Sequence, residues 1–190
     1  FADMTALRGA ALSATPAAAG KLEFSGKVRV IDGDTIDVGR ARVRLHGIDA
    51  PEQDQTCTAA DGRDWPCGRW VTQKVRATLE GRNATCQPRD IDRYGRTVAR
   101  CLVDGQDLGA YLVRSGLAFA YVKYSTDYVG DEKSSRRAGK GLHASQLQDP
   151  AAFRRAKQPG APAQASTGCL IKGNISSKGV RIYHSPGQRD

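Results

Sequence analysis

The chain has 190 residues, 39% of them hydrophobic, so it can form one sizeable core and a small appendage. Its 29 Lys and Arg against 20 Asp and Glu give a formal charge of +9, which favours a polyanionic partner, and nucleic acid first of all. A membrane partner is excluded, because no apolar run approaches the length of a span and no basic amphipathic helix is visible.

Residues 1–20 contain eight alanines and predict a flexible leader ahead of the folded part. The alternative is the remnant of a secretory signal, because Ala17, Ala18 and Ala19 resemble a cleavage site. Strand signals follow directly, and the main domain is expected to cover residues 21–148.

The stretch "KLEFSGKVRVIDGDTIDVGRARVRLHGIDAPE" predicts three short strands, with turns near Gly26, Gly33 and Gly39. Asp32 and Asp34 would share one face of a regular strand, unless Gly33 marks a bulge that turns one of them away. Taken alone, an Asp-Gly-Asp sequence is also typical of an ordinary turn.

Residues 53–66 are polar and irregular, and the sequence after them predicts a helix that Gly81 is suited to end. Every fourth residue from the start of this helix is apolar, which predicts one buried face. These residues are Cys67, Val71, Val75 and Leu79.

The stretch "NATCQPRDIDRYGRTVARCLVDG" predicts a hairpin with its turn at residues 92–95. Cys86 and Cys101 lie equally far from this turn, so they would face each other across a regular ladder, close enough for a disulfide. Cys57 and Cys67 flank the irregular loop and would join it to the start of the helix. The alternative is four free thiols; two disulfides indicate an oxidising compartment.

A second helix is expected after Asp107, its N-cap, and a third, very basic one in "DEKSSRRAGKGL". Residues 149–168 are rich in Ala, Pro and Gln, a composition typical of a linker, and residues 169–190 are expected to form part of a small module. The order of strands and helices predicts an α+β fold, with an antiparallel sheet or barrel and helices at one side.

Three carboxylates are the best candidates for ligands of a hard cation such as calcium or magnesium: Asp34, Asp49 and Glu52. An EF-hand loop starting at Asp32 is excluded, because its fifth and twelfth positions hold isoleucine and valine. Asp32 is expected to support the turn at Gly33, and Asp37 to be solvated without a role.

Two arginines could bind a phosphate with their planar, bidentate donors, Arg44 in "RVRLHGIDAPE" and Arg96 in "DRYGR". The alternative for each is a solvated position on a basic surface. The tyrosines of the chain could line a groove and stack on bases, or they could pack in the core. The candidates are Tyr94, Tyr121, Tyr124 and Tyr128.

Four segments in this order, "VIDGDT", "VRLHGIDAPE", "DRYGR" and "GLAFAYVKY", resemble the staphylococcal nuclease family over roughly residues 24–145. The resemblance implies an OB-fold, a five-stranded antiparallel β-barrel with three α-helices. It also implies a calcium-dependent, sugar-nonspecific nuclease that hydrolyses phosphodiester bonds of DNA and RNA and leaves 3′-phosphate ends. We expect it to act as a monomer.

The resemblance also implies roles for single residues. Asp34 and Asp49 match the carboxylate ligands of calcium, and Ala50 matches a position that contributes its backbone carbonyl. Glu52 matches the residue that orients or deprotonates the attacking water.

The phosphate and the nucleotide are matched by a second group of residues. Arg44 and Arg96 correspond to the two arginines that clamp the phosphate in this family. Tyr94, Tyr121 and Tyr124 correspond to residues that line the nucleotide pocket.

The family pattern is interrupted by the loop 53–66, and His143 stands where a Trp is common. The tail resembles the opening of a small Cys-containing module of the sunset type, in which Cys169 is free or has its partner beyond the end of this chain. We expect a secreted or periplasmic protein. The main alternative is a non-catalytic nucleic-acid-binding OB module, which the complete set of acids and arginines disfavours; a basic cell-surface protein acting through its tail is a third.

Overall fold

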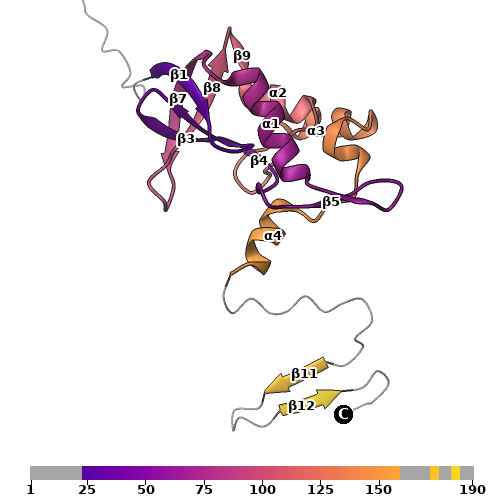
Figure 1. The fold of residues 1–190 in the computed structure, drawn as a ribbon. Coiled ribbons are helices and arrows are strands. Elements are labelled where there is room, and N and C mark those ends of the chain that lie inside the picture. The colour runs from indigo at the N-terminus through magenta and orange to yellow at the C-terminus, as the bar shows by residue number, and fades with distance from the viewer. Residues whose placement is uncertain (1–22, 159–171, 176–180, 185–190) are drawn as a thin grey trace, which may run out of the picture. The chain divides into compact units, whose positions relative to one another are not determined.

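The computed structural model describes residues 23–158, 172–175 and 181–184 (Figure 1). The chain divides into two compact units, Phe1–Leu147 and Gln148–Asp190, and each is described by itself. The strands of the first unit are β1 (Phe24–Val30), β2 (Thr35–Val38), β3 (Ala41–Leu45), β4 (Ile48–Asp49), β5 (Cys57–Thr58), β6 (Asp64–Trp65), β7 (Asn83–Ile91), β8 (Thr97–Val103), β9 (Gln106–Asp107) and β10 (Phe119–Ala120). Its helices are α1 (Cys67–Leu79), α2 (Leu108–Arg114), α3 (Val129–Arg137) and the 3-10 helix η1 (Gly141–Ala144).

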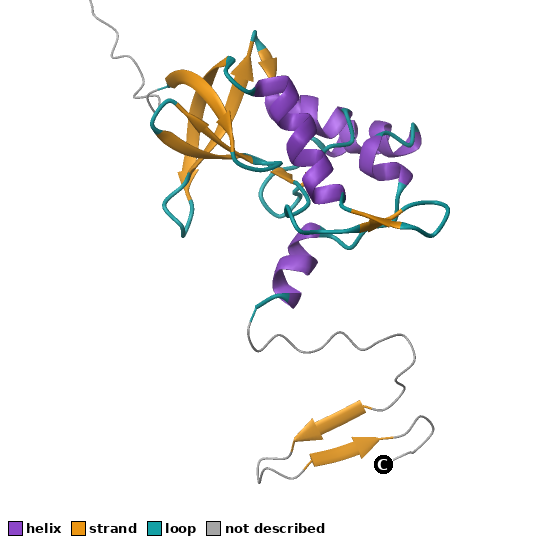
Figure 2. Ribbon diagram, viewed as in Figure 1, coloured by secondary structure: helices purple, strands orange, loops and turns teal. Residues whose placement is uncertain are grey.

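Five strands close into a barrel, with helices α1, α2 and α3 gathered at one side of it (Figure 2). In the order β3, β2, β1, β7 and β8 each strand pairs antiparallel with the next, and β3 pairs in parallel with β8 to close the ring. One parallel pair is required, because strand directions cannot alternate all the way round a ring with an odd number of strands. The predicted α+β fold with an OB-type barrel is confirmed.

Close contacts explain two glycines of this barrel, Gly26 inside a strand and Gly33 in a bend. No turn forms at Gly26, which lies inside β1, and an added Cβ there would stand 2.6 Å from the backbone nitrogen of Gly39. Gly33 lies in a bend between β1 and β2, where a Cβ would stand 2.6 Å from the Cβ of Ala50 and 2.9 Å from Val71 of α1. The expected turn at Gly26 is therefore wrong, and Gly33 lets the bend approach α1.

The three aspartates of the bend and β2 have separate roles. Asp32 Oδ1 accepts hydrogen bonds from the backbone N–H groups of Asp34 (3.1 Å) and Thr35 (2.7 Å), so Asp32 holds the bend. The bend also means that Asp32 and Asp34 do not share the face of a regular strand. Asp37 is not simply solvated, because it forms ion pairs with Arg29 of β1 and Arg42 of β3. Its cross-strand register explains this, since Asp37 lies opposite both arginines.

Helix α1 presents the predicted apolar face to the core. Its four expected residues are at most 1% exposed: Cys67, Val71, Val75 and Leu79. The helix ends where Gly81 adopts a φ of 74°, and it is tied to the end of β1 by Arg76, whose Nη2 donates to the Val30 carbonyl over 3.1 Å. Helix α1 and the barrel therefore bury a common core.

Both predicted disulfides form. Cys86 lies directly opposite Cys101 in the β7–β8 ladder and the two are joined, as predicted, although the ladder is not regular and shifts its register between Pro88 and Asp90. Cys57 of β5 is joined to Cys67 at the start of α1. The small β5–β6 hairpin begins at Cys57 and ends shortly before Cys67. Thr58 of this hairpin forms an isolated antiparallel bridge with Gln146, near the end of the first unit.

In the second unit, the segment expected to be a linker begins with a helix, α4 (Pro150–Ala156). Asp149 caps it by accepting a hydrogen bond from the N–H of Ala152 over 2.8 Å, so the described residues contain four α-helices rather than three. Strands β11 (Lys172–Ile175) and β12 (Arg181–His184) pair antiparallel. The leader and Cys169 lie outside the described residues.

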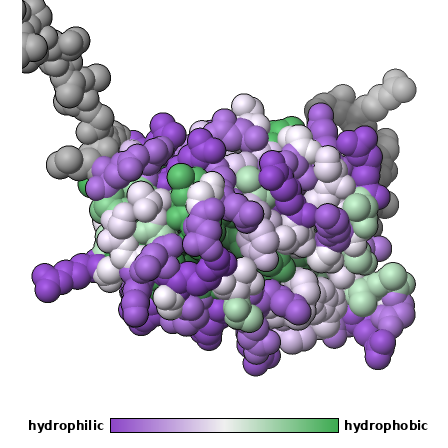
Figure 3. All heavy atoms as spheres, turned by 90° about the horizontal axis from the view of Figure 1, so that it is seen from above, coloured by the Kyte–Doolittle hydropathy of each residue, from purple (hydrophilic) through white to green (hydrophobic). Residues whose placement is uncertain are grey.

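Hydrophilic side chains cover most of the face seen in Figure 3, and apolar atoms show there only in small areas. Within the described ranges, no helix combines the length and the apolar character needed to cross a bilayer. Two acidic residues, Asp34 and Asp49, are buried despite their charge.

Candidate active site

Arg44 joins the two predicted carboxylate ligands. From β3, its Nη1 donates to Asp34 Oδ1 over 2.6 Å and its Nη2 to Asp49 Oδ1 over 2.8 Å. Asp34 precedes β2 and Asp49 lies in β4, so the β2–β3 pairing and the turn into β4 bring the three together. The other oxygen of Asp34 accepts a hydrogen bond from the Ala50 N–H over 3.0 Å, which places Ala50 at the same point.

The two carboxylates are buried, with side chains 6% and 4% exposed for Asp34 and Asp49. Burial raises the pKa of the Asp34 carboxyl above its usual range; Arg44 lowers it and Asp32 raises it further. A buried carboxylate pair that shares one guanidinium is an environment in which additional positive charge would stabilise the ionised forms.

The donor chemistry of this point fits a hard cation. Asp34, Asp49 and the carbonyl of Ala50 offer only oxygen, the ligand atom that calcium and magnesium prefer. Within the described part of the chain, no three His, Cys, Asp or Glu side chains lie together, so a cation would need backbone carbonyls, water or substrate oxygens as well. A cation here would compete with Arg44 for the same carboxylate oxygens.

Arg96 reaches the same point from the start of β8, the strand that pairs with β3 to close the barrel. It precedes Thr97, which pairs with Val43 in the parallel β3–β8 contact, so the closure brings Arg96 next to β3. Its Nη1 donates to Thr35 Oγ1 over 3.1 Å, and Thr35 Oγ1 in turn donates to Asp34 Oδ1 over 3.1 Å. Two guanidiniums therefore converge on Asp34, one directly and one through a hydroxyl.

Asp92 holds the other edge of Arg96. Its Oδ2 accepts from Arg96 Nε over 2.7 Å, and its Oδ1 accepts from the Arg96 backbone N–H over 3.0 Å. Burial would raise the pKa of Asp92, but the hydrogen bonds from Arg96 keep it below the usual range. Sequence reasoning missed Asp92 and Thr35, although both lie in the quoted motifs, as the first residue of "DRYGR" and the last of "VIDGDT".

Glu52 is half-buried, and its backbone is fixed by Gln55. The Glu52 N–H donates to Gln55 Oε1 over 3.3 Å, and the Glu52 carbonyl accepts from the Gln55 N–H over 2.9 Å. The next residue, Gln53, donates through Nε2 to the carbonyl of Ile31 over 2.9 Å. The turn that carries Glu52 is thus tied to the segment that leads into the Asp34 bend.

The three tyrosines lie in two places. Tyr94, 68% exposed, is at the tip of the β7–β8 hairpin, with the Arg96 guanidinium 5.4 Å from its ring centre. Tyr121 follows β10, which pairs with β4 so that Phe119 lies opposite Asp49, and its ring centre is 4.9 Å from that of Tyr124. The structure therefore brings Tyr94 to Arg96, and it connects Tyr121 and Tyr124 to the site through the strand that carries Asp49.

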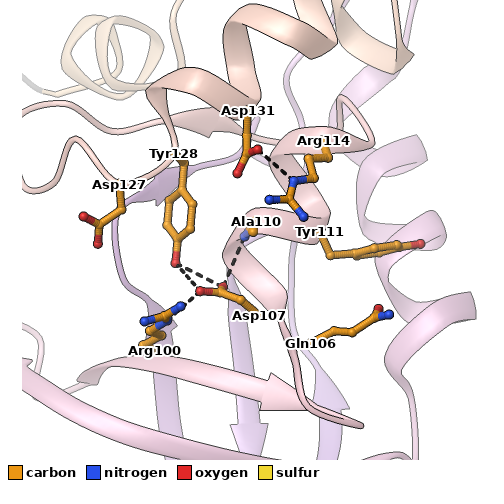
Figure 4. Close-up of a pocket in the computed structure, with 9 residues that line it drawn as sticks. All are labelled: Arg100, Gln106, Asp107, Ala110, Tyr111, Arg114, Asp127, Tyr128 and Asp131. Atoms are coloured by element: carbon orange, nitrogen blue, oxygen red, sulfur yellow. Dashed lines mark hydrogen bonds and ion pairs between the residues drawn. The ribbon is translucent and has the colours of Figure 1, made fainter.

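A separate cavity of about 510 Å³ lies between β8, α2 and the start of α3, and of the candidate residues named from the sequence only Tyr128 lines it (Figure 4). Asp107 organises it, because this N-cap of α2 accepts hydrogen bonds from Ala110 N, from Arg100 Nε and from the Tyr128 hydroxyl. Burial raises the pKa of Tyr128, and Asp107 adds to this. Tyr128 is 4% exposed and belongs to the core, not to a nucleotide groove.

Comparison with known proteins shows the family to which the chain belongs. A family model described as "Staphylococcal nuclease homologue" matches residues 42–145, which include every predicted site residue except Asp34. The chain is 35% identical over 151 residues to "Succinoglycan biosynthesis protein ExoI" of Rhizobium meliloti, covering 76% of this chain and 78% of that protein. It is 31% identical over 155 residues to "Micrococcal nuclease" of Shigella flexneri (72% and 83%).

An "Uncharacterized endonuclease" of Escherichia coli O157:H7 is 38% identical over 107 residues, which cover 54% of this chain and 63% of that protein. The family model matches more than half of the 190 residues. The matches to the Rhizobium meliloti and Shigella flexneri proteins cover more than two thirds of the length of those proteins. The chain belongs to the staphylococcal nuclease family.

Proposed function

We propose that the chain is a calcium-dependent, sugar-nonspecific nuclease that hydrolyses phosphodiester bonds of DNA and RNA and leaves 3′-phosphate ends. The observation that carries the proposal is the convergence of Arg44 and Arg96 on the buried Asp34, directly and through Thr35. Family membership and the nuclease names of two relatives support the reaction class.

The two arginines suit a phosphodiester. Attack by water places additional negative charge on the phosphoryl oxygens, and preorganised guanidiniums stabilise charge that develops near them. Arg96 is preorganised by Asp92 and Thr35, so little side-chain freedom remains to be lost when a phosphate binds. Calcium, held by Asp34, Asp49 and the Ala50 carbonyl, would supply further positive charge at the phosphoryl group.

Glu52 is the proposed general base. Its carboxylate would accept a proton from the attacking water while the oxygen of that water forms the new bond to phosphorus. The bond from phosphorus to the 5′-oxygen breaks, this oxygen takes a proton from solvent water and leaves as a 5′-hydroxyl, and the phosphate stays on the 3′ side. Tyr94, next to Arg96, and the Tyr121–Tyr124 pair are proposed to contact the nucleotide, because aromatic rings stack on any base and so favour little sequence preference.

Hydrolysis of single-stranded DNA and of RNA tests the proposal, with calcium, with chelator, and with Glu52→Ala beside the wild type. We expect cleavage that requires calcium, 3′-phosphate ends on both substrates, and a variant that binds DNA normally but turns over far more slowly. Full activity in chelator would refute calcium dependence. Equal DNA binding by both proteins without cleavage by either would instead favour the non-catalytic OB module.

A secreted or periplasmic location and a monomeric state complete the proposal. The location is supported by two buried disulfides, Cys57–Cys67 and Cys86–Cys101, because such bonds persist in oxidising compartments. Thiol labelling of protein from its native source tests the location, and labelling of the four cysteines of these two disulfides would contradict it. Light scattering tests the oligomeric state, for which the mass of one chain is expected.

A further inference from the structure

The backbone of Glu52 lies directly against the first turn of α1, at Gly68. A Cβ built on Gly68 would stand 1.7 Å from the carbonyl oxygen of Glu52 and 2.8 Å from its carbonyl carbon. No side chain fits at such distances, so residue 68 must be glycine for the Glu52 turn to lie where it does. This glycine serves close packing, because Gly68 is the second residue of a regular helix.

Gln55 connects the same two segments by hydrogen bonds. Gln55 is only 1% exposed, and its Oε1 accepts a hydrogen bond from the Glu52 N–H. Its backbone N–H donates to the Glu52 carbonyl, and its carbonyl accepts from the Gly68 N–H over 3.1 Å. One buried residue therefore fixes both backbone groups of Glu52 and joins them to α1.

The Cys57–Cys67 disulfide closes this unit from the other side. Cys57 is two residues beyond Gln55, and Cys67 directly precedes Gly68, so the bond joins the chain on either side of the contact. Both cysteines are buried, at 2% and 0% exposed. The turn that carries Glu52 is thus attached to the helix by packing, by hydrogen bonds and by a covalent bond.

We propose that Gly68 and Gln55 are positioning residues for the hydrolysis, which act by fixing the backbone from which the Glu52 side chain extends. This inference rests on the proposed function, in which Glu52 is the general base. A general base displaced by about 1 Å can cost about 100-fold in rate without weakening substrate binding. The expected signature of a displaced Glu52 is therefore a lower kcat at an unchanged KM.

The test replaces Gly68 and a matched glycine. Gly130 is the second residue of α3, as Gly68 is of α1, and a Cβ built on it meets nothing within 4 Å. We expect Gly68→Ala to lower kcat at least tenfold with KM within about twofold of the wild type. Gly130→Ala should leave both constants unchanged, and circular dichroism should show that both variants are folded.

A double-mutant cycle with Glu52→Ala separates positioning from general damage. If Gly68 acts through Glu52, Gly68→Ala should cause no further loss in single-turnover rate when Glu52 is already absent. A loss of the same factor in both backgrounds, or a wild-type kcat in Gly68→Ala, would overturn the inference. Should Gly68→Ala fail to fold, Gln55→Leu takes its place, with the same criteria.

The proposed function and the positioning inference fail in different ways. A wild type without calcium-dependent cleavage would refute the proposed function and, with it, this inference. A wild type that cleaves, together with a fully active Gly68→Ala or Gln55→Leu, would refute only the positioning by Gly68 and Gln55.

Discussion

Replacing Arg96 with lysine should reduce turnover far more than stability. The Arg96 side chain is 24% exposed and contacts Asp92 through Nε and Thr35 through Nη1. A lysine keeps the charge but has a single nitrogen, so it cannot make both contacts. The lost hydrogen bond to Thr35 is worth about 1 kcal/mol and a partly exposed ion pair about 0.2–1 kcal/mol, so unfolding should become easier by about 1–2 kcal/mol.

The expected loss in catalysis is larger. Removing one preorganised donor from a site of developing charge costs about 100- to 1,000-fold in kcat, or about 3–4 kcal/mol. Arg96→Lys should therefore lose about two to three times as much free energy in the transition state as in folding. This ratio distinguishes a residue that binds the phosphoryl group from one that only supports the barrel.

The assay combines steady-state cleavage of single-stranded DNA in calcium with urea unfolding. Arg100→Lys is the control, because Arg100 lies in β8 only four residues beyond Arg96 and also pairs with an aspartate, Asp107, but lies outside the site. It should lose a similar amount of stability and keep its turnover. A kcat for Arg96→Lys within about threefold of the wild type would remove Arg96 from the site.

Three further predictions concern stability. Arg44→Gln leaves two buried carboxylates without their shared guanidinium, so it should lower the free energy of unfolding by about 3–5 kcal/mol. Calcium should restore part of this stability in thermal melts. A melting temperature that does not change with calcium would contradict a cation site there. Burial lowers the pKa of His143, so the unfolded chain binds more protons below about pH 6.5 and stability should fall as the pH drops through that value. His143→Phe should remove this decrease in urea midpoints between about pH 7 and pH 5, and an unchanged pH dependence would assign it to another group. Replacing both cysteines of Cys57–Cys67 or of Cys86–Cys101 by alanine should lower the free energy of unfolding by about 3 kcal/mol in each case, because the closed loops are similar in length. Only loss of the Cys57–Cys67 disulfide should lower kcat. Equal effects on kcat would contradict the attachment of the Glu52 turn to α1.

Much of the fold follows from local rules in the sequence. The apolar residues of α1 recur with the period of a helix, so they fall on one face, which is buried. Cys86 and Cys101 pair within their own hairpin. The cap at Asp107 has a similar local origin. The cap at Asp149 was equally readable from "DP" before an alanine-rich run, but the linker-like composition concealed helix α4.

Other features depend on contacts between distant segments and could not be predicted locally. Gly26 lies in a strand where the backbone at Gly39 packs against it, so a side chain would not fit there. This contact exists only once the barrel has formed. Asp37 pairs with arginines of both neighbouring strands, so its role depends on register. Likewise, the candidate ligands and arginines were identified through a family resemblance, whereas the connecting Thr35 and the contact of Glu52 with Gly68 required the closed structure.

The calcium dependence of hydrolysis, measured side by side for the wild type and Asp34→Asn, tests the proposed site most directly. Asparagine keeps the shape of the side chain and removes its charge, so both Arg44 and a bound cation would lose one of their two carboxylate partners. We predict saturable activation of the wild type by calcium and none in chelator. Asp34→Asn should need at least tenfold more calcium and reach a lower maximal rate. Wild-type activity in chelator, or an unchanged calcium requirement in Asp34→Asn, would contradict a cation-assisted site at Asp34.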